Sequence, residues 1–556
     1  MIWEIFKKEF RDQLNTFRFL FGLGFCLIVF PLFAAVIGGN LNLRQENYLT
    51  RVQESEKKLS NIMVYGNVNP QVYRQPSKLS IICRGVEEQL PADAQILLQG
   101  IIIPMGSEAS SNRGHVESRY QLLELSDQAK EYFEENRPNY AMNVFGAAPL
   151  KSGLGLIGVF PGFDISFLVI FVFSLLALIF GYNNVSGERE SATIKLVLAG
   201  RCSRFQFVLG KALAGFVSLT ALIFISLVSA LLTFMLLFNI SFNSTEWMLL
   251  VLLFVGTVLF AFVFLNIGLL FSSLIRHSST SLIAGLVTWV FLVVCSPVLV
   301  GGIVNKYVSL PDDQRLNEYS AEILADAGER VSEINEEIQS QIPPQPSNWA
   351  NIQSDADSPL GGWYHWFLTR YRALKYMTTF PYTEPVWVDA GNRMVQVMDD
   401  YYRDLDAQSR YFALFSGFNP VQAYKNLSMR LCGTDASAFF NFYDQAKSYR
   451  RVILTYLTDR NAFAQLRYIV GTDLSIDQLP DTRENYMRMM KERYDYEARR
   501  PKNPPPPIPD IPRFQYKIPG ITDKVTATYK GFGFLAIINL LLIMASIVIV
   551  SKSSLN

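Results

Sequence analysis

The residues whose types and spacing most clearly suggest a chemical role lie in one charged segment between two apolar stretches. Glu188, Arg189 and Glu190 alternate in charge near the start of segment 183–211. Such a run can pair with opposite charges on a partner, where ion pairs set the register of a contact more than its strength. The chain has no GxSxG or HExxH motif that would predict a catalytic nucleophile or a metalloprotease. The segment therefore predicts a contact site rather than covalent chemistry.

No nucleotide or metal site is expected within this chain. Gly210-Lys211 lacks both the upstream glycine and the following Ser or Thr of a P-loop, which cradles phosphates with backbone amides and a lysine. The three histidines are far apart, and none of the five cysteines forms a CxxC pair: His115, His277 and His365; Cys26, Cys83, Cys202, Cys295 and Cys432. We predict no enzymatic activity and no cofactor in this chain.

The composition is that of a membrane protein with large water-facing parts. Of the 556 residues, 50% are hydrophobic and only 18% are charged, whereas soluble chains carry roughly 25% charged residues. The formal net charge is +1, so no overall basicity indicates nucleic acid as a partner.

Six uncharged apolar stretches are long enough to cross a membrane, which takes about 20 residues. They are predicted as transmembrane helices at 19–37, 165–182, 212–238, 247–274, 281–303 and 531–550. A cleaved signal peptide is the alternative for the first, with Ala34-Ala35 as the processing site. Glu4, Glu9 and Asp12 precede it, and such acidic residues are unusual in a signal peptide.

The charges beside these stretches predict their orientation. Residues 1–18, 183–211, 274–280 and the tail after 550 together carry 11 basic and 5 acidic residues. Because Lys and Arg accumulate on the cytoplasmic side, we expect both termini in the cytoplasm of a bacterial inner (plasma) membrane. The insertions 38–164 and 304–530 are then exoplasmic.

Residues 1–18 predict a helix lying in the membrane interface. Its apolar residues recur every three or four positions, and most of its basic residues lie off that stripe, as in interfacial helices. The apolar set is Ile2, Trp3, Phe6, Phe10, Leu14 and Phe17.

The two insertions are expected to pack into one α+β ectodomain. In 38–164, a polar helical stretch at Leu43–Leu59 is followed by strand-like runs at Lys78–Cys83 and Gln95–Pro104. The second insertion, 304–530, is mainly helical by its periodicity. Its candidate helices are Asp312–Ile342, Trp363–Met377, Arg393–Tyr411, Ala436–Leu457 and Thr482–Arg499. The proline-rich run 501–509 predicts an extended spacer rather than a ligand for an SH3 or WW domain.

Two cysteines and two asparagines each have two possible roles. Cys83 and Cys432 could bridge the two insertions through a disulfide, or be unpaired buried thiols. Asn266 and Asn539 lie within predicted spans, where they could line a conduit or join helices, the second being favoured. The six stretches hold no charged residue, which argues against a proton- or sodium-coupled carrier.

Segment 183–211 resembles the central loop of type-2 ABC exporter (ABC-2 type) permeases. The matching residues are Glu188-Arg189-Glu190, Thr193, Leu196, Leu198, Ser203-Arg204 and Gly210-Lys211. Ala192 departs from a usual glycine, and Arg201 stands where proline is common. The order of an interfacial helix, six spans and this loop is also similar, as are Ser272-Ser273-Leu274 and Trp289.

A second set of residues resembles a subgroup of that family with a large exoplasmic insertion of unknown function. These residues are Cys432-Gly433-Thr434-Asp435, Phe442 and Tyr449-Arg450.

The resemblance implies the permease subunit of an ATP-driven exporter. Two cytoplasmic ATPase subunits would bind ATP and Mg²⁺, and a second permease, identical or homologous, would pair with this chain to move substrate or transmit force across the membrane. Coupling to the ATPase would fall to Glu188, Arg189, Glu190, Thr193, Ile194, Lys195, Leu196 and Arg204. Membrane lipid and a periplasmic protein are further expected partners, and the substrate is not specified. The alternative is an exoplasmic structural or assembly protein anchored by six spans, without transport of its own.

Overall fold

The structure is a computed structural model of the chain. It describes residues 2–87, 90–98, 100–102, 164–191, 203–307, 313–342, 370–415, 417–469, 476–479, 485, 488 and 507–552. The predicted helix Thr482–Arg499 and most of the proline-rich run lie outside the described residues.

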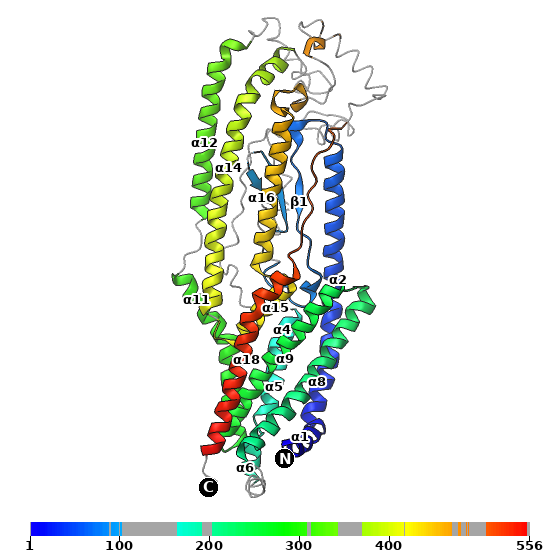
Figure 1. Ribbon diagram of the computed structural model, residues 1–556, viewed down its shortest axis with the longest axis vertical. Helices are drawn as coiled ribbons and strands as arrows, with labels where there is room; N and C mark the ends of the chain where they lie inside the picture. Colours follow the sequence, from blue (N-terminus) through cyan, green and yellow to red (C-terminus); the bar gives the residue numbers. More distant parts are fainter. Residues whose placement is uncertain are drawn as a thin grey trace, which may run out of the picture.

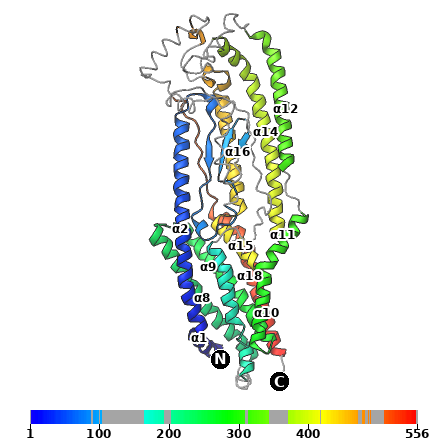
Figure 2. The ribbon, with the colours of Figure 1, turned by 180° about the vertical axis from the view of Figure 1, so that it is seen from behind.

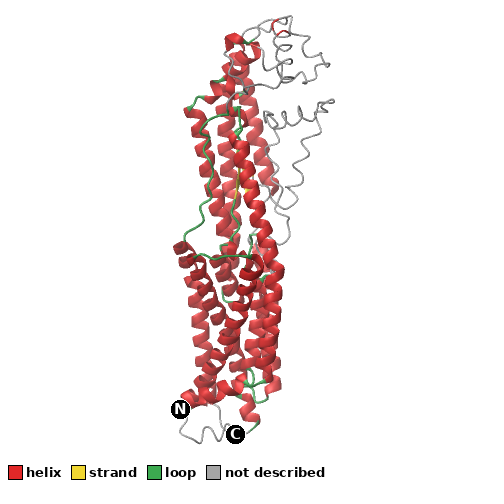
Figure 3. Ribbon diagram, turned by 90° about the vertical axis from the view of Figure 1, so that its right-hand side faces the viewer, coloured by secondary structure: helices red, strands yellow, loops and turns green. Residues whose placement is uncertain are grey.

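The molecule is elongated and has two parts (Figure 1). A helix bundle carries both chain ends at its lower, terminal end. The upper part of α2, a small sheet and helices α12, α14 and α16 form what we call the distal domain, which continues beyond the bundle (Figures 2 and 3). The chain is mainly helical, as predicted.

Six helices of the described chain are long and apolar enough to cross a membrane, and each contains one predicted stretch. The bundle consists of α1 (Ile2–Leu14), α2 (Phe17–Ser60), α4 (Ile165–Leu168), η5 (Val169–Phe173), α5 (Ser174–Gly181), α6 (Ser186–Glu190), α8 (Arg204–Phe238), α9 (Ser244–Leu274), α10 (Ser278–Val290), η6 (Phe291–Cys295), α11 (Ser296–Tyr307) and α18 (Ile521–Lys552).

Helix α2 runs without interruption from the bundle into the distal domain. Its 44 residues correspond to about 66 Å at 1.5 Å per residue, roughly twice the hydrocarbon thickness. The first predicted span and the polar stretch Leu43–Leu59 are therefore one element, which continues through Gly38-Gly39. Thr16 begins it by accepting a hydrogen bond from the amide of Phe19.

Two spans contain a π-helical turn, η5 and η6. In η6, the amide of Ser296 bonds to the carbonyl of Phe291, five residues back. The next carbonyl, Leu292, would need the amide of residue 297, but that residue is a proline and has no N–H. Asn419 supplies the missing donor, with its Nδ2 2.7 Å from the Leu292 oxygen. Pro297 thus accounts for the irregularity of this span.

Helices α5 and α9 approach most closely at two glycines. A Cβ on Gly181 would lie 2.3 Å from the carbonyl oxygen of Leu265, and one on Gly268 would lie 2.7 Å from that of Leu178. Small residues at such crossings let helix backbones pack in van der Waals contact, which stabilises helix pairs in membranes.

A three-stranded antiparallel sheet forms the β part of the distal domain: β1 (Gln71–Tyr73), β2 (Asp93–Leu97) and β3 (Gly100–Ile102). Val72 pairs with Ala94, and Ile96 pairs with Ile101. The predicted strand at Lys78–Cys83 was wrong, because Lys78–Ile81 forms the 3-10 helix η2. Its Leu79 and Ile81 are buried in the bundle core rather than alternating on a sheet face.

The helices of the distal domain are α12 (Asp313–Ile338), α14 (Arg370–Phe415) and α16 (Ala436–Asp459), with short 3-10 turns at η1 (Tyr65–Asn67), η7 (Gln339–Gln341), η10 (Ala462–Ala464), η11 (Leu466–Tyr468) and η12 (Ile476–Gln478). Two helices were predicted where α14 is one, because it continues through Pro381 and Pro385. Val386 and Ala390 pack there on α12, and this packing offsets the lost backbone hydrogen bonds.

The two insertions share one hydrophobic core in their described parts. Val72 and Ile96 of the first pack with Phe439 and Phe442 of α16. The guanidinium of Arg450 donates to the carbonyls of Leu97 and Leu98, which ties α16 to the hairpin. The described parts of the two insertions thus pack against each other, while their place outside the membrane stays a prediction.

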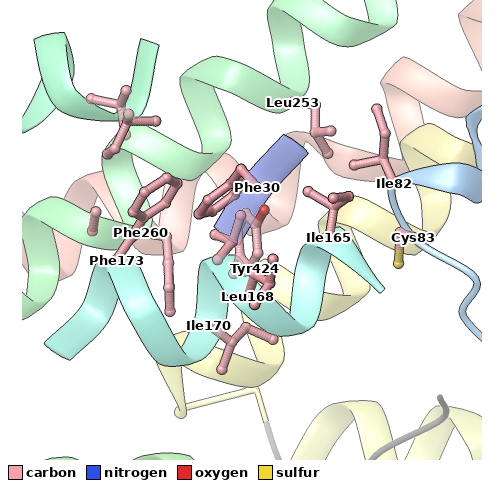
Figure 4. Packing of buried hydrophobic residues seen from close by; sticks show 14 of the residues in the cluster. Phe30, Ile82, Cys83, Ile165, Leu168, Ile170, Phe173, Leu253, Phe260 and Tyr424 are labelled. Carbon is pink, nitrogen blue, oxygen red and sulfur yellow. The ribbon is translucent and has the colours of Figure 1, made fainter. Parts of the chain in front are cut away.

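Helix α15 (Pro420–Cys432) packs at the junction between the distal domain and the upper end of the bundle. Tyr424 stacks on Phe260 of α9 with ring centroids 4.6 Å apart, and its hydroxyl lies 3.0 Å from that of Thr257. Figure 4 shows Tyr424 among Phe30 and Phe173 of two other spans. The sequence did not predict this helix.

Candidate functional site

The charged segment of the sequence begins with α6, at the terminal end of the bundle. The amides of Val185 and Ser186 both donate to Oγ of Ser272, each at 2.9 Å. Ser272 lies near the end of α9. The first turn of α6 is therefore seated on a neighbouring span, which satisfies two amides that have no acceptor inside the helix.

Glu188 contacts a buried lysine. Its carboxylate lies 2.7 Å from Nζ of Lys211, and Glu9 of α1 contacts the same ammonium at 2.8 Å. The Lys211 side chain is only 3% exposed. A buried ammonium is costly unless it is paired and hydrogen-bonded. The three residues, here called the Lys211 hub, join α1, α6 and α8 through one charge.

The glycine before Lys211 has a packing role. A Cβ at Gly210 would lie 2.8 Å from Cγ2 of Ile5 on α1. Glycine therefore lets α1 lie directly against α8, which brings Glu9 to Lys211. This gives a physical reason for the Gly210-Lys211 pair noted in the sequence.

Arg189 and Glu190 bind the turn between α9 and α10. Arg189 donates from Nη1 to the carbonyl of Ser273 at 2.9 Å. Glu190 accepts from the amide of Ser278 at 2.9 Å and from its hydroxyl at 2.7 Å. Each of the three alternating charges thus has a partner within the chain.

Arg204 begins α8 at the other end of the segment. Its Nη1 donates to the carbonyl of Val550 at 3.1 Å, near the end of α18. Ser203 and Gln206 form a reciprocal capping box that fixes the start of α8. Thr193, Ile194, Lys195 and Leu196 lie outside the described residues.

The combination of six candidate spans, an N-terminal helix against the third span and this charged link is the arrangement that the sequence resemblance implied. Residues 3–455 match the family model of the ABC-2 family transporter protein.

The chain belongs to the ABC-2 transporter family.

This ABC-2 family protein is a multi-pass membrane protein. Permeases of the family normally lack ATPase activity, so membership of the family implies that a separate ATPase is the partner. A comparison with curated proteins finds no match. The family match does not distinguish the subgroup with an exoplasmic insertion, so that assignment stays a prediction, as does the orientation of the termini.

Helix α1 of this ABC-2 protein carries a row of stacked aromatic side chains. Trp3 and Phe6 stack with centroids 5.0 Å apart, and Phe6 stacks on Phe10 at 5.7 Å. The Trp3 side chain is 60% exposed. Such a stripe fits a helix in the membrane interface, although its place in the membrane stays a prediction.

The two asparagines within the spans bind each other. Nδ2 of Asn266 donates to Oδ1 of Asn539 at 2.8 Å, and Nδ2 of Asn539 donates to the carbonyls of Leu259 and Leu535. Both asparagines are buried. This arrangement joins α9 to α18 and favours packing over a conduit.

Cys83 and Cys432 are buried free thiols in this structure, the second of the two interpretations above. Their segments nevertheless meet. The hydroxyl of Ser77 donates to the Cys432 carbonyl at 2.5 Å, and the amide of Val86 donates to the Thr434 carbonyl at 3.0 Å.

Sequence reasoning missed the partners of the charged segment. Lys211 was noted only as part of an incomplete P-loop and of a family pattern, and Ser278 was not considered. One signal was available. Lys211 lies about two turns into a long apolar helix, where burying an unpaired cation would be costly, so a carboxylate partner could have been expected.

Proposed function

We propose that this chain is the transmembrane permease subunit of an ATP-driven exporter. A separate ATPase binds the segment between α6 and α8 and supplies ATP and Mg²⁺ chemistry. A second permease, identical or homologous, completes the transport unit. The family membership supports an ATPase partner, and the remaining steps are argued from contacts at the terminal end of the bundle.

The Lys211 hub is the observation that carries the proposal. Ion pairs with Glu9 and Glu188 link three helices at one buried point. Glu190 connects α6 to α10 through its hydrogen bond with Ser278. Arg204 connects α8 to α18 through its hydrogen bond with the Val550 carbonyl. A displacement of α6 by a bound ATPase would therefore reach α1, α8, α10 and α18, because direct contacts of 2.7–3.1 Å connect them.

These contacts revise the role of the charged triplet within the proposal. Glu188, Arg189 and Glu190 hold α6 to the bundle and transmit its movement. We assign ATPase docking to the residues that follow α6 and to the exposed parts of the segment. Ion pairs suit such a role because they fix orientation at modest net gain in stability.

Purification of the tagged full chain from its native membranes tests this function. We expect a chain with a P-loop to co-purify, and ATP hydrolysis to depend on the permease. Lys211→Met should lower this stimulated hydrolysis while the ATPase remains bound. Lys211→Arg should retain most of it, and Lys8→Met, which removes an exposed lysine of α1, should leave it unchanged.

Absence of any ATPase from the purified material would favour the alternative, a structural or assembly protein. Equal stimulation by the wild-type chain and Lys211→Met would remove the hub from the coupling path.

A further inference from the structure

The exposed surface of α14 changes character near its lower end. Arg403 and Arg410 have side chains that are 73% and 80% exposed. Below Arg410 the exposed side chains are apolar or aromatic: Tyr411, Leu414, Phe415 and Phe418. We call these four the α14 foot. Leu414 is 66% exposed and Phe418 is 84% exposed. No charged residue occurs between Arg410 and Lys425.

The contact of Asn419 fixes the level of this foot relative to the fifth candidate span. Asn419 donates to the Leu292 carbonyl at 2.7 Å and lies 3.0 Å from Oγ of Ser296. Leu292 is 14 residues above Ser278, hence about 21 Å along the helix. With roughly 30 Å of hydrocarbon to cross, Leu292 lies about 9 Å inside the boundary on the distal-domain side, and Phe418, next to Asn419, therefore lies at the depth of that leaflet.

The foot is continuous with a surface that must face lipid or another membrane helix. Helix α11, which packs against α14, exposes Val298, Leu299 and Ile303. The span from Ser278 to residue 305 contains no charged residue, and Lys306 is its first one on this side. Lys306 is thus the first charged residue above the apolar surface of α11, and Arg410 is the first above the foot.

We propose that the α14 foot inserts into the membrane leaflet on the distal-domain side and contacts lipid acyl chains. Aromatic side chains are favoured at this depth, and Tyr can keep its hydroxyl at the headgroups. An aqueous surface would not favour four large exposed apolar side chains within eight residues. The foot anchors the lower end of α14 beside α11, and this role does not depend on transport or on an ATPase.

Quenching of a fluorescent label tests the proposal in the full chain. The chain is reconstituted in phosphatidylcholine vesicles with or without dibrominated phosphatidylcholine, after replacing Cys202 and Cys295 to remove competing thiols. Bimane is attached to Phe418→Cys or, as an independent variant, Leu414→Cys. Val298→Cys, on the exposed apolar surface of α11, is the control within a candidate span. Val452→Cys on α16, 48% exposed in the wild type, is the control in the distal domain.

We expect brominated lipid to quench bimane at 418 and 414 as strongly as at 298, with little effect at 452. Aqueous iodide should quench only the label at 452. Quenching of both foot positions by iodide and not by brominated lipid would overturn the proposal. So would resistance to both quenchers, since that pattern means that a second copy or another protein covers the foot.

Discussion

Nε1 of Trp289 donates a 2.7 Å hydrogen bond to Oγ of Ser174, and this bond joins two spans beside their π-helical turns. Ser174 follows η5 directly, and Trp289 precedes η6 by two residues. Phe171 of η5 also meets the Trp289 ring edge-on at 5.9 Å. Since π-turns widen a helix and expose backbone groups, the two irregular turns support each other.

This pair should show measurable coupling. Trp289→Phe and Ser174→Ala each remove one partner, and a double-mutant cycle isolates their interaction. We expect a coupling free energy of about 0.6 kcal/mol, typical of hydrogen bonds between membrane helices. Thermal or denaturant unfolding of the detergent-solubilised chain measures it. Strictly additive effects would mean that the bond contributes nothing beyond packing.

Glu384 should make the distal domain less stable as pH rises. Burial raises the pKa of this carboxyl from 4.5 to about 7. The folded state therefore binds the proton more tightly, and stability is greatest below the unfolded pKa and falls as pH rises through the folded pKa. Glu384→Gln should abolish the decline between about pH 4.5 and 7. Unfolding midpoints across this range test it, and parallel curves for both proteins would contradict it.

The two buried thiols should resist modification in the folded chain. Burial raises the pKa of Cys83 to about 12 and also raises the pKa of Cys432. Because the thiolate is the reactive form, N-ethylmaleimide should label Cys83 and Cys432 only after unfolding. Intact-mass measurement counts the adducts. Failure to label either one after unfolding without reductant would instead show the disulfide that the sequence left open.

The distribution of basic residues predicts which bundle end is cytoplasmic. Two single-cysteine variants test this orientation. His277→Cys labels the terminal end of the bundle, where the His277 side chain is 75% exposed. Lys57→Cys labels the exposed surface of α2 in the distal domain. An impermeant maleimide should label position 57 and not position 277 in intact cells. Labelling of position 277 under these conditions would reverse the orientation.

Sequence patterns predicted the elements better than their contacts. Apolar length alone located all six candidate spans, and the periodicity of Ala436–Leu457 anticipated α16. The strand at Lys78–Cys83 failed because its apolar residues are buried by helices of the bundle, which a local pattern does not report. The partners of Glu188 and Glu190 are distant in sequence, so no spacing rule could supply them. The donor that replaces the amide missing at Pro297 comes from Asn419, which is more than 100 residues away in the sequence, so no local pattern could supply it.

The continuity of α2 gives the molecule a lever arm. Beyond Pro31, the only proline of the helix, its remaining 29 residues extend for about 43 Å. A bend of about 10° at the proline, where helices yield most easily, would sweep the upper tip sideways by about 7 Å. Above the proline, Gly38 sits against the ring of Phe238, the last residue of α8. A small bend of α2 at the level of the membrane would thus displace its tip in the distal domain by several ångströms.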